Sequence, residues 1–257
     1  FSGPPINVQL DGTPGQLAAL FAKVSKQWHH LGETEPHWSV LTNDSYFQQN
    51  FQMNRNAFYQ SGLSELAMFE KTLARARVDR QGLRHCVELG CGVGRVTAAL
   101  ATKFDHVTGI DISAAHLKVA EDHVRAAGID NIILRKLDSI DSVPALGTFD
   151  LLYSRIVLQH NPPPVMARIL GDLLAQLNPG GIAYFQVPTY KAGYQFGIEA
   201  YLDVQNGTDM EMHYFPQAAL LELVAQRGCR VLEIREDDAI GLSVSAISNT
   251  LLVQKAG

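Results

Sequence analysis

The sequence predicts an α/β fold, in which a doubly wound and mostly parallel sheet carries helices on both faces. Three observations predict it. From residue 83 onward, short apolar runs alternate with segments of helical periodicity, which is the pattern of a parallel sheet. The first run stops at alternating glycines, and a helical pattern follows at once. The glycines, and the aspartates that follow the next two runs, fall at the carboxyl ends of strands, where ligands bind in such folds.

The residues before this alternation are predicted to be mainly helical. Large apolar side chains recur at helical intervals over residues 14–31. An irregular, aromatic-rich piece is expected at 35–41, followed by one or two helices over 44–77 with a break near Gly62. We therefore expect extra N-terminal helices, which form a cap over residues 1–78 and pack on the rest of the chain.

The remaining residues, 79–257, are expected to form the core domain. Its strands are expected over 83–89, 106–110, 131–137, 149–154, 182–187, 229–236 and 245–254. Its helices are expected over 94–104, 113–128, 162–177 and 216–227. Ser113 is a good N-cap and Gly128 a good stop for the second of these helices. The run Asn178-Pro179-Gly180-Gly181 predicts a turn before the fifth strand.

Residues 188–215 would connect the fifth strand to the last helix. About 28 residues is long for such a connection, and long loops in compact domains often act as lids or bind substrates. We therefore expect a lid or substrate insertion here. An alternative is that most of the aromatic rings only dock the N-terminal helices on the sheet. The rings concerned are Trp28, Trp38, Tyr46, Phe47, Phe51, Phe58, Tyr59, Tyr190, Tyr194, Phe196, Tyr201, Tyr214 and Phe215.

The composition argues against several classes of protein. The chain has 257 residues, 46% hydrophobic content and a net charge of −5, which suits a globular domain with a sizeable core. No Lys/Arg run is present, so we expect no nucleic-acid partner. The apolar runs are too short to span a membrane, and the first residues lack both Met and a signal-peptide pattern, as in a trimmed chain. Three cysteines without a CxxC pair favour a cytoplasmic location.

The glycine run indicates a nucleotide-like ligand. Glycines allow the backbone to approach a ligand closely and to adopt positive φ. A dinucleotide fingerprint requires Gly-x-Gly-x-x-Gly, but counting from Gly90 the sixth residue is Arg95. The third glycine is instead Gly94, one residue earlier, and an acid, Glu88, lies two residues before the first. This spacing disfavours an NAD-dependent oxidoreductase, which we keep as a distant alternative.

The pattern Glu-x-Gly-x-Gly-x-Gly resembles the first motif of the class I S-adenosylmethionine (SAM) dependent methyltransferases. The resemblance is specific over residues 82–188, extends plausibly to the C-terminus and says little about residues 1–60. It implies a seven-stranded sheet of the class I methyltransferase type with an antiparallel last strand. It also implies SAM as methyl donor and S-adenosylhomocysteine as product.

The resemblance suggests a role for each acid near the expected ligand. Glu88 would meet the ammonium group of SAM, and Asp111, 17 residues after Gly94, would accept from the ribose hydroxyls. Asp138 would accept from the adenine amino group, with the nearby Asp141 as a competitor. The expected cofactor-binding residues are Glu88, Gly90, Cys91, Gly92, Gly94, Asp111, Ile112, Asp138, Ser139, Ser154 and Arg155.

The methyl acceptor is less well indicated. We expect a small molecule with a hydroxyl oxygen as the methylated atom, and His160 or His213 as the base, since imidazole titrates near neutral pH. The alternative to a catalytic role for His160 is a role in packing. Asn161-Pro162-Pro163-Pro164 lacks the aromatic residue that stacks a base in amino-methyltransferases.

Alternatives remain open for the acceptor and the assembly. They are N- or C-methylation of a small molecule, modification of a macromolecule, and SAM binding without transfer. The chain would be a monomer or homodimer. No metal site is expected, because the histidines lack ligand spacing.

Overall fold

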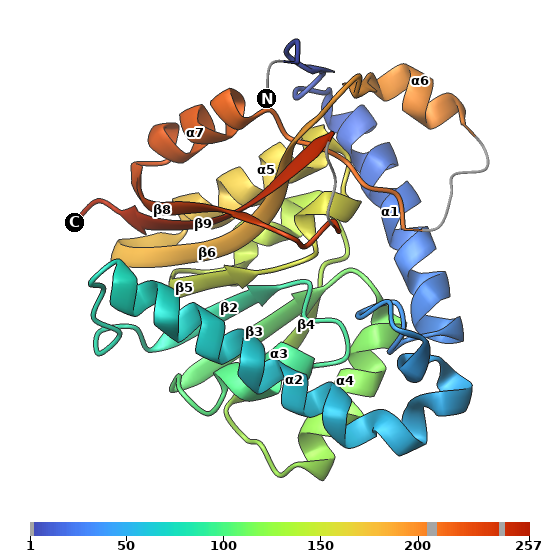
Figure 1. Cartoon of the computed structure of the whole chain (residues 1–257), viewed down its shortest axis with the longest axis vertical. Coiled ribbons are helices and arrows are strands. Elements are labelled where there is room, and N and C mark those ends of the chain that lie inside the picture. The colour runs from blue at the N-terminus through green and yellow to red at the C-terminus, as the bar shows by residue number, and fades with distance from the viewer. Residues whose placement is uncertain (1–2, 205–209, 242–244) are drawn as a thin grey trace. The chain divides into compact units, whose positions relative to one another are not determined.

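The computed structural model describes residues 3–204, 210–241 and 245–257. Seven strands form a mixed sheet in the order β4-β3-β2-β5-β6-β9-β8 (Figure 1). Strand β2 is parallel to β3 and β5, β3 is parallel to β4, and β9 is antiparallel to both β6 and β8. This confirms the predicted α/β class and its reversed last strand. The strands are β2 (His85–Leu89), β3 (His106–Asp111), β4 (Ile132–Lys136), β5 (Phe149–Ser154), β6 (Leu177–Lys191), β8 (Cys229–Asp237) and β9 (Ala246–Lys255).

The helices follow the predicted alternation, with ends that differ by a few residues. The α-helices are α1 (Pro14–Thr34), α2 (Gln48–Arg75), α3 (Arg95–Leu100), α4 (Ala114–Ala126), α5 (Pro163–Ala175), α6 (Ile198–Asp203) and α7 (Gln217–Gln226). The described residues also form the short 3-10 helices η1 (Asp44–Tyr46), η2 (Ile140–Leu146) and η3 (Leu158–His160). No helix in the described part of the chain combines the length and apolarity that a membrane crossing requires.

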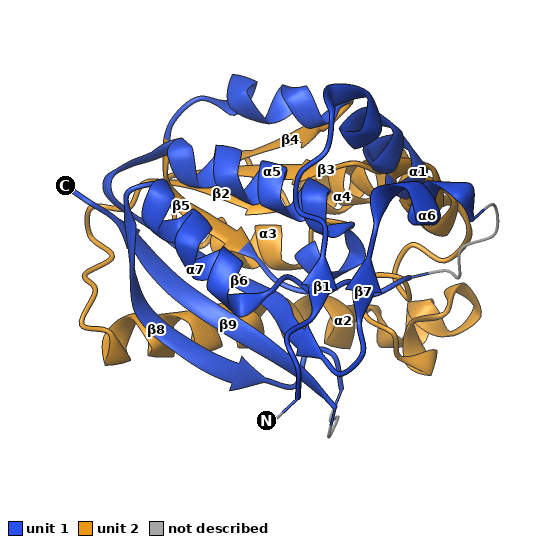
Figure 2. Cartoon of the chain, turned by 90° about the horizontal axis from the view of Figure 1, so that it is seen from above, with its two compact units in different colours: residues 1–24, 139–148, 154–257 blue, residues 25–138, 149–153 orange. Residues whose placement is uncertain are grey.

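The chain forms two compact units, which Figure 2 shows in different colours. Unit 1 comprises residues 1–24, 139–148 and 154–257, and unit 2 comprises residues 25–138 and 149–153. The predicted division at residue 78 stays a prediction.

In unit 2 the predicted helix break near Gly62 is wrong. Helix α2 runs unbroken from Gln48 to Arg75. A Cβ at Gly62 would lie 2.2 Å from the backbone oxygen of Arg95, the first residue of α3. Glycine is therefore present because two helices approach closely, and not because the helix ends there.

In unit 1 the predicted turn at residues 178–181 is also wrong. Strand β6 begins at Leu177 and passes through the Pro-Gly-Gly sequence. Gly180 adopts a φ of +78°, and its carbonyl accepts a hydrogen bond from the Gln254 side chain of β9 at 3.1 Å. The glycine supplies the positive φ that the strand requires at this position, and the Gln254 bond ties it to the neighbouring strand.

Two short strands in unit 1 escaped the sequence analysis. Strand β1 (Asn7–Val8) pairs in parallel with β7 (Gln195–Phe196). The Gln9 backbone N–H donates to the Phe196 carbonyl at 3.0 Å, and the Ile198 N–H donates to Gln9 Oε1 at 3.0 Å. The start of the chain is thus fastened to the expected insertion 188–215, of which residues 205–209 lie outside the described residues.

Candidate functional site

The glycine loop of unit 2 connects β2 to α3 and requires its glycines. Gly90, Gly92 and Gly94 have φ values of +72°, +53° and +80°, in the left-handed region that favours glycine. The N–H groups of Gly90 and Cys91 both donate to the Ile110 carbonyl of β3, at 2.8 and 3.1 Å. The strand, turn and helix predicted from the sequence are therefore confirmed, and the loop is anchored to the neighbouring strand.

Space around the loop is limited on two sides. A Cβ at Gly92 would lie 2.8 Å from Val40 Cγ2, and a Cβ at Gly109 of β3 would lie 3.0 Å from Cys91 Cβ. Cys91 is buried, and burial raises the pKa of its thiol, which stays protonated. Its small size fits the close approach of the loop to β3.

Asp111 lies at the end of β3, directly beside the glycine loop. Its carboxylate accepts the Gly92 N–H at 2.8 Å through Oδ2 and the Ser113 N–H at 2.8 Å through Oδ1. Ser113 caps α4, as predicted, by accepting the His116 N–H. Each carboxylate oxygen keeps a second lone pair for a ligand hydroxyl. Ile112, between these two polar residues, is half-buried.

Glu88 is buried at the end of β2 and accepts a 2.5 Å hydrogen bond from Thr97 Oγ1. Burial raises the pKa of this carboxyl to about 8, although the Thr97 bond and the Arg95 guanidinium act in the opposite direction. In the absence of a bound cation the group is therefore mainly protonated at neutral pH.

Arg95, the residue that breaks the dinucleotide pattern, fastens α3 to α2. Its guanidinium donates to Ser61 Oγ at 3.0 Å and lies 3.9 Å from Glu65 Oε1. Glu65 in turn accepts from the Tyr153 hydroxyl at the end of β5. A glycine at position 95 would lose the contacts of the guanidinium with Ser61 and Glu65.

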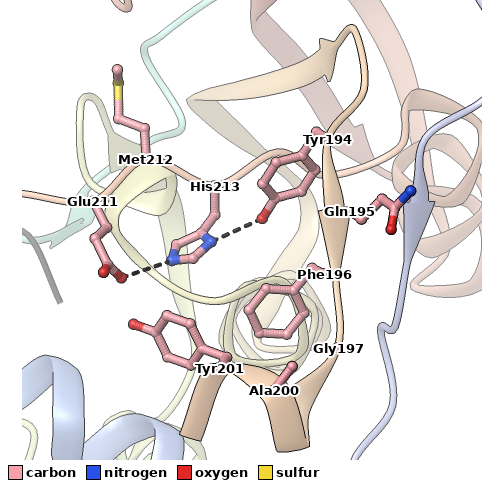
Figure 3. A pocket seen from close by; sticks show the side chains of 9 residues that line it. All are labelled: Tyr194, Gln195, Phe196, Gly197, Ala200, Tyr201, Glu211, Met212 and His213. Atoms are coloured by element: carbon pink, nitrogen blue, oxygen red, sulfur yellow. Dashed lines mark hydrogen bonds and ion pairs between the residues drawn. The ribbon is translucent and has the colours of Figure 1, made fainter. Parts of the chain in front are cut away.

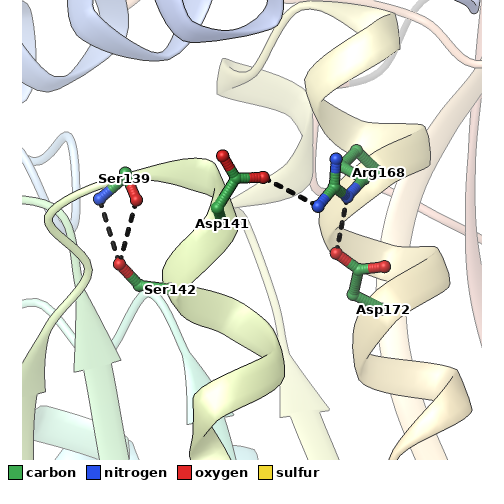
Figure 4. Close-up of polar contacts among 5 residues, drawn as sticks. All are labelled: Ser139, Asp141, Ser142, Arg168 and Asp172. Atoms are coloured by element: carbon green, nitrogen blue, oxygen red, sulfur yellow. Dashed lines mark hydrogen bonds and ion pairs between the residues drawn. The ribbon is translucent and has the colours of Figure 1, made fainter. Parts of the chain in front are cut away.

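The two competing aspartates after β4 have different surroundings. Asp138 is exposed, and its carboxylate lies 2.7 Å from Lys136 Nζ. In unit 1, Asp141 accepts from Arg168, which also donates to Asp172 (Figure 4). Asp141 thus ties η2 to α5. Each of the two acids has a cation at hydrogen-bond distance and both are well exposed, so their surroundings do not choose between them.

Ser139 begins η2 in unit 1. Its N–H donates to Ser142 Oγ at 3.3 Å, and the two hydroxyls are 3.1 Å apart. A ligand that accepts a hydrogen bond from the Ser139 N–H would replace only this long hydrogen bond to Ser142, so little free energy would be lost.

In unit 1, Ser154 and Arg155 lead into a strained turn. Ser154 is buried and Arg155 is half-buried. Ile156 has a φ of +58°, which is unfavourable for a β-branched residue, and its N–H donates to Gln186 Oε1 at 3.0 Å. Strained backbone of this kind is frequent at functional sites.

The glutamines that hold this turn were not predicted from the sequence. Gln186 also donates to Gln159 Oε1 at 3.1 Å and to Ser248 Oγ at 2.7 Å. Gln186 is fully buried between two apolar residues of β6, Phe185 and Val187. A polar residue in such a run was the signal that could have revealed it.

His160 is buried with both ring nitrogens engaged. Nδ1 lies 3.0 Å from the Glu211 carbonyl, and Nε2 lies 3.2 Å from the amide nitrogen of Gln159. Burial lowers the pKa of the ring, so the imidazole is neutral. This geometry favours the packing alternative, in which His160 positions the chain at Glu211.

His213 lines a pocket of about 410 Å³ in unit 1 (Figure 3). Its Nδ1 lies 2.8 Å from the Tyr194 hydroxyl, and its Nε2 lies 3.7 Å from Glu211 Oε2. Burial lowers the pKa of His213 to about 4, with smaller contributions from His160 and Lys23. The pocket is lined by Tyr194, Gln195, Phe196, Gly197, Ala200, Tyr201, Glu211, Met212 and His213.

Within the described ranges, no group of three or more His, Cys, Asp or Glu side chains is placed to hold a metal ion.

Comparison with known proteins identifies the family. Residues 86–181 match the family described as "Methyltransferase domain". The chain is 31% identical over 193 residues to a ubiquinone biosynthesis O-methyltransferase of Colwellia psychrerythraea, which covers 72% of this chain and 66% of that protein. The chain belongs to the class I SAM-dependent methyltransferase family.

Other members of the methyltransferase family match over shorter stretches. A trans-aconitate 2-methyltransferase of Deinococcus radiodurans is 36% identical over 116 residues, or 44% of this chain and 42% of that protein. This chain thus spans about two fifths of the length of the trans-aconitate enzymes that it matches.

Solved structures share the methyltransferase fold along most of the chain. Magnesium protoporphyrin IX methyltransferase from Synechocystis PCC 6803, with S-adenosylhomocysteine bound, has a TM-score of 0.60 and 16% identity over 92% of this chain and 100% of that chain. A [4+2]-cyclase has a TM-score of 0.56 and 14% identity over 98% of this chain and 99% of that chain. At these identities the likeness concerns the fold alone.

Proposed function

We propose that this chain is a SAM-dependent methyltransferase, which transfers a methyl group to a hydroxyl oxygen of a small molecule. One observation carries the proposal. The left-handed glycine loop is bonded directly to Asp111, beside the buried Glu88, within the stretch that matches the methyltransferase family. A loop of this kind brings bare backbone and a carboxylate to one place, as a nucleoside ligand requires.

The residues of unit 2 suit SAM. Asp111 has free lone pairs for two ribose hydroxyls, and the buried Glu88 gains its charge when an ammonium group lies near. Asp138 is proposed for the adenine amino group. When bound, SAM supplies an electrophilic methyl group on a sulfonium. Ser139, Ser154 and Arg155 belong to unit 1, and their proposed part in cofactor binding rests on the family resemblance alone.

The task of the protein is then to align the acceptor, exclude water and receive a proton. We propose residues 188–215 as the segment that binds the acceptor, because the pocket of His213 is built largely from it. His213 is the better candidate base, since its Nε2 has no hydrogen-bond partner whereas both nitrogens of His160 have one.

Two observations support the proposal that the methyl acceptor is a small molecule. Relatives are named for trans-aconitate and for ubiquinone biosynthesis, the latter as O-methyltransferases. The chain has a net charge of −5 and lacks a basic run, which is unfavourable for a nucleic-acid partner. The three cysteines are all free, which suits the proposed cytoplasmic location.

Calorimetric titration with SAM tests the cofactor assignment. The wild-type chain is expected to bind SAM, and Asp111→Ala to abolish binding because the ribose acceptor is lost. Asp122→Ala, at an exposed aspartate of α4, is the matched control and should bind as the wild type does. Thermal unfolding checks that each variant is folded. Unchanged binding by a folded Asp111→Ala would refute the site, and binding of NADH in place of SAM would refute the function.

A further inference from the structure

We propose that the pocket of unit 1 binds a neutral ring with one hydroxyl or two adjacent hydroxyls, and rejects ligands that carry a carboxylate or phosphate there. This inference rests on the proposed function and specifies its acceptor. It is carried by the polar atoms, the charge and the rings of the pocket, which lie entirely within unit 1.

Two buried polar atoms face each other in the pocket without a hydrogen-bond partner. They are His213 Nε2 and Glu211 Oε2, 3.7 Å apart (Figure 3). The His213 side chain is only 7% exposed, so solvent does not readily satisfy it. Hydrogen bonds from a ligand to both atoms would therefore contribute more binding free energy than hydrogen bonds to solvent-exposed atoms.

A hydroxyl group matches this pair of atoms. The Glu211 carboxylate can only accept, whereas the imidazole Nε2 donates or accepts according to which nitrogen carries the proton. One hydroxyl can donate to Glu211 and accept from Nε2. Two adjacent hydroxyls can donate to both atoms. A ligand carboxylate cannot donate a hydrogen bond to Glu211, because it has no proton.

The charge of the pocket acts in the same direction. Of its nine lining residues Glu211 is the charged one, and none is Lys or Arg. Lys23 lies close, but its ammonium donates to the carbonyls of Tyr201 and Val204, at 2.7 and 2.8 Å, and lies 4.1 Å from the Tyr201 ring centroid. An anionic ligand would face the carboxylate without a free cation, which is repulsive.

The remaining walls are aromatic and fixed in place. Phe196 lies 5.3 Å from Tyr201 and 5.4 Å from His213, measured between ring centroids. Tyr194 is held by its bond to His213. Such walls suit the flat face of a phenol or the apolar face of a sugar ring. Trans-aconitate, the polycarboxylate in the names of three relatives, does not fit this description.

Binding of matched neutral and anionic probes tests the inference. The neutral probes are catechol and methyl glucoside, and their anionic counterparts are 3,4-dihydroxybenzoate and methyl glucuronide. Titration is followed by NMR in the presence of S-adenosylhomocysteine. We expect one neutral probe to bind, which tells phenol from sugar, and its counterpart to bind at least about tenfold more weakly because of like-charge repulsion.

Variants connect this discrimination to Glu211. Glu211→Gln keeps the shape of the side chain and removes its charge. It should therefore reduce the difference in affinity between the neutral probe that binds and its anionic counterpart to less than about threefold. Glu222→Gln, at an exposed position of α7, is the control and should keep the difference. Tyr194→Phe should weaken the neutral probe by freeing the His213 ring.

Three results would overturn the inference: no binding of either neutral probe, equal or tighter binding of the anionic probe by the wild type, or discrimination unchanged in folded Glu211→Gln. SAM titration separates this failure from failure of the proposed function. A chain that binds SAM but fails the probe test loses only the acceptor class.

Discussion

Glu88 is only 4% exposed. It lies beside the glycine loop, where the ammonium group of SAM is proposed to bind. The Thr97 hydroxyl that donates to this carboxyl is neutral, and burial outweighs the charge of Arg95. The pKa of Glu88 is therefore raised because burial removes the hydration of the carboxylate, and the nearby protein groups do not stabilise its charge to the same extent. An incoming ammonium group would be that partner.

The pH dependence of stability should expose this group in the cofactor-free protein. The unfolded chain releases the Glu88 proton near its ordinary pKa of 4.5, whereas the folded protein holds it to about 8. The stabilisation is therefore complete below the lower value and is lost as the pH rises through the higher one. Relative to Glu88→Gln, the wild-type free energy of unfolding should fall by a few kcal/mol across this window.

Urea unfolding of both proteins near the two ends of the window measures the difference. Glu121→Gln, at an exposed position of α4, is the control and should parallel the wild type. Parallel curves for wild type and Glu88→Gln would show that the carboxyl is charged throughout.

At the scale of elements, the position of Gly62 shows what a sequence pattern leaves open. A glycine within a helical pattern either ends a helix or allows a close neighbour. The neighbour here is the backbone of Arg95, which is far along the chain, so local periodicity carries no sign of it. The glycine loop differs, because its strand, turn and helix all lie within the 16 consecutive residues 85–100, and it was predicted correctly.

Alanine substitution should separate the two kinds of glycine. Gly62→Ala places a Cβ 2.2 Å from a backbone oxygen, so α2 and α3 must move apart, and we expect a loss of about 2 kcal/mol despite the better helix propensity of alanine. Gly15→Ala in α1 meets nothing within 4 Å and is expected to leave stability unchanged or raise it by up to about 1 kcal/mol. Thermal unfolding of the two variants compares them directly, and a neutral Gly62→Ala would contradict the close approach.

At the scale of the molecule, local motifs were predictable and long-range assemblies were not. Asp111 could be placed because it ends a strand that follows the glycine loop. The pocket could not, because Tyr194, Glu211 and His213 owe their arrangement to contacts that no spacing rule describes. His160 was singled out for its chemistry, yet its position depends on the Glu211 carbonyl, 51 residues away.

The pairing of β1 with β7 joins residues nearly 190 positions apart, and strands of two residues have no periodicity to detect. This pairing supports the wall of the pocket, since the Ile198 N–H at the start of α6 bonds to Gln9. Removal of residues 1–9 should therefore loosen residues 195–203, while a chain that begins at Pro5 keeps β1 and serves as the control.

Hydrogen exchange measured by mass spectrometry provides the readout. In the shortened chain the amides of 195–203 should exchange at least about tenfold faster, because local opening no longer breaks the bonds to β1. The amides of β2 and β3, in unit 2, should be unaffected. Equal protection of 195–203 in the two truncated chains would mean that the pocket wall is held by the rest of unit 1, and that the start of the chain has no part in shaping the acceptor site.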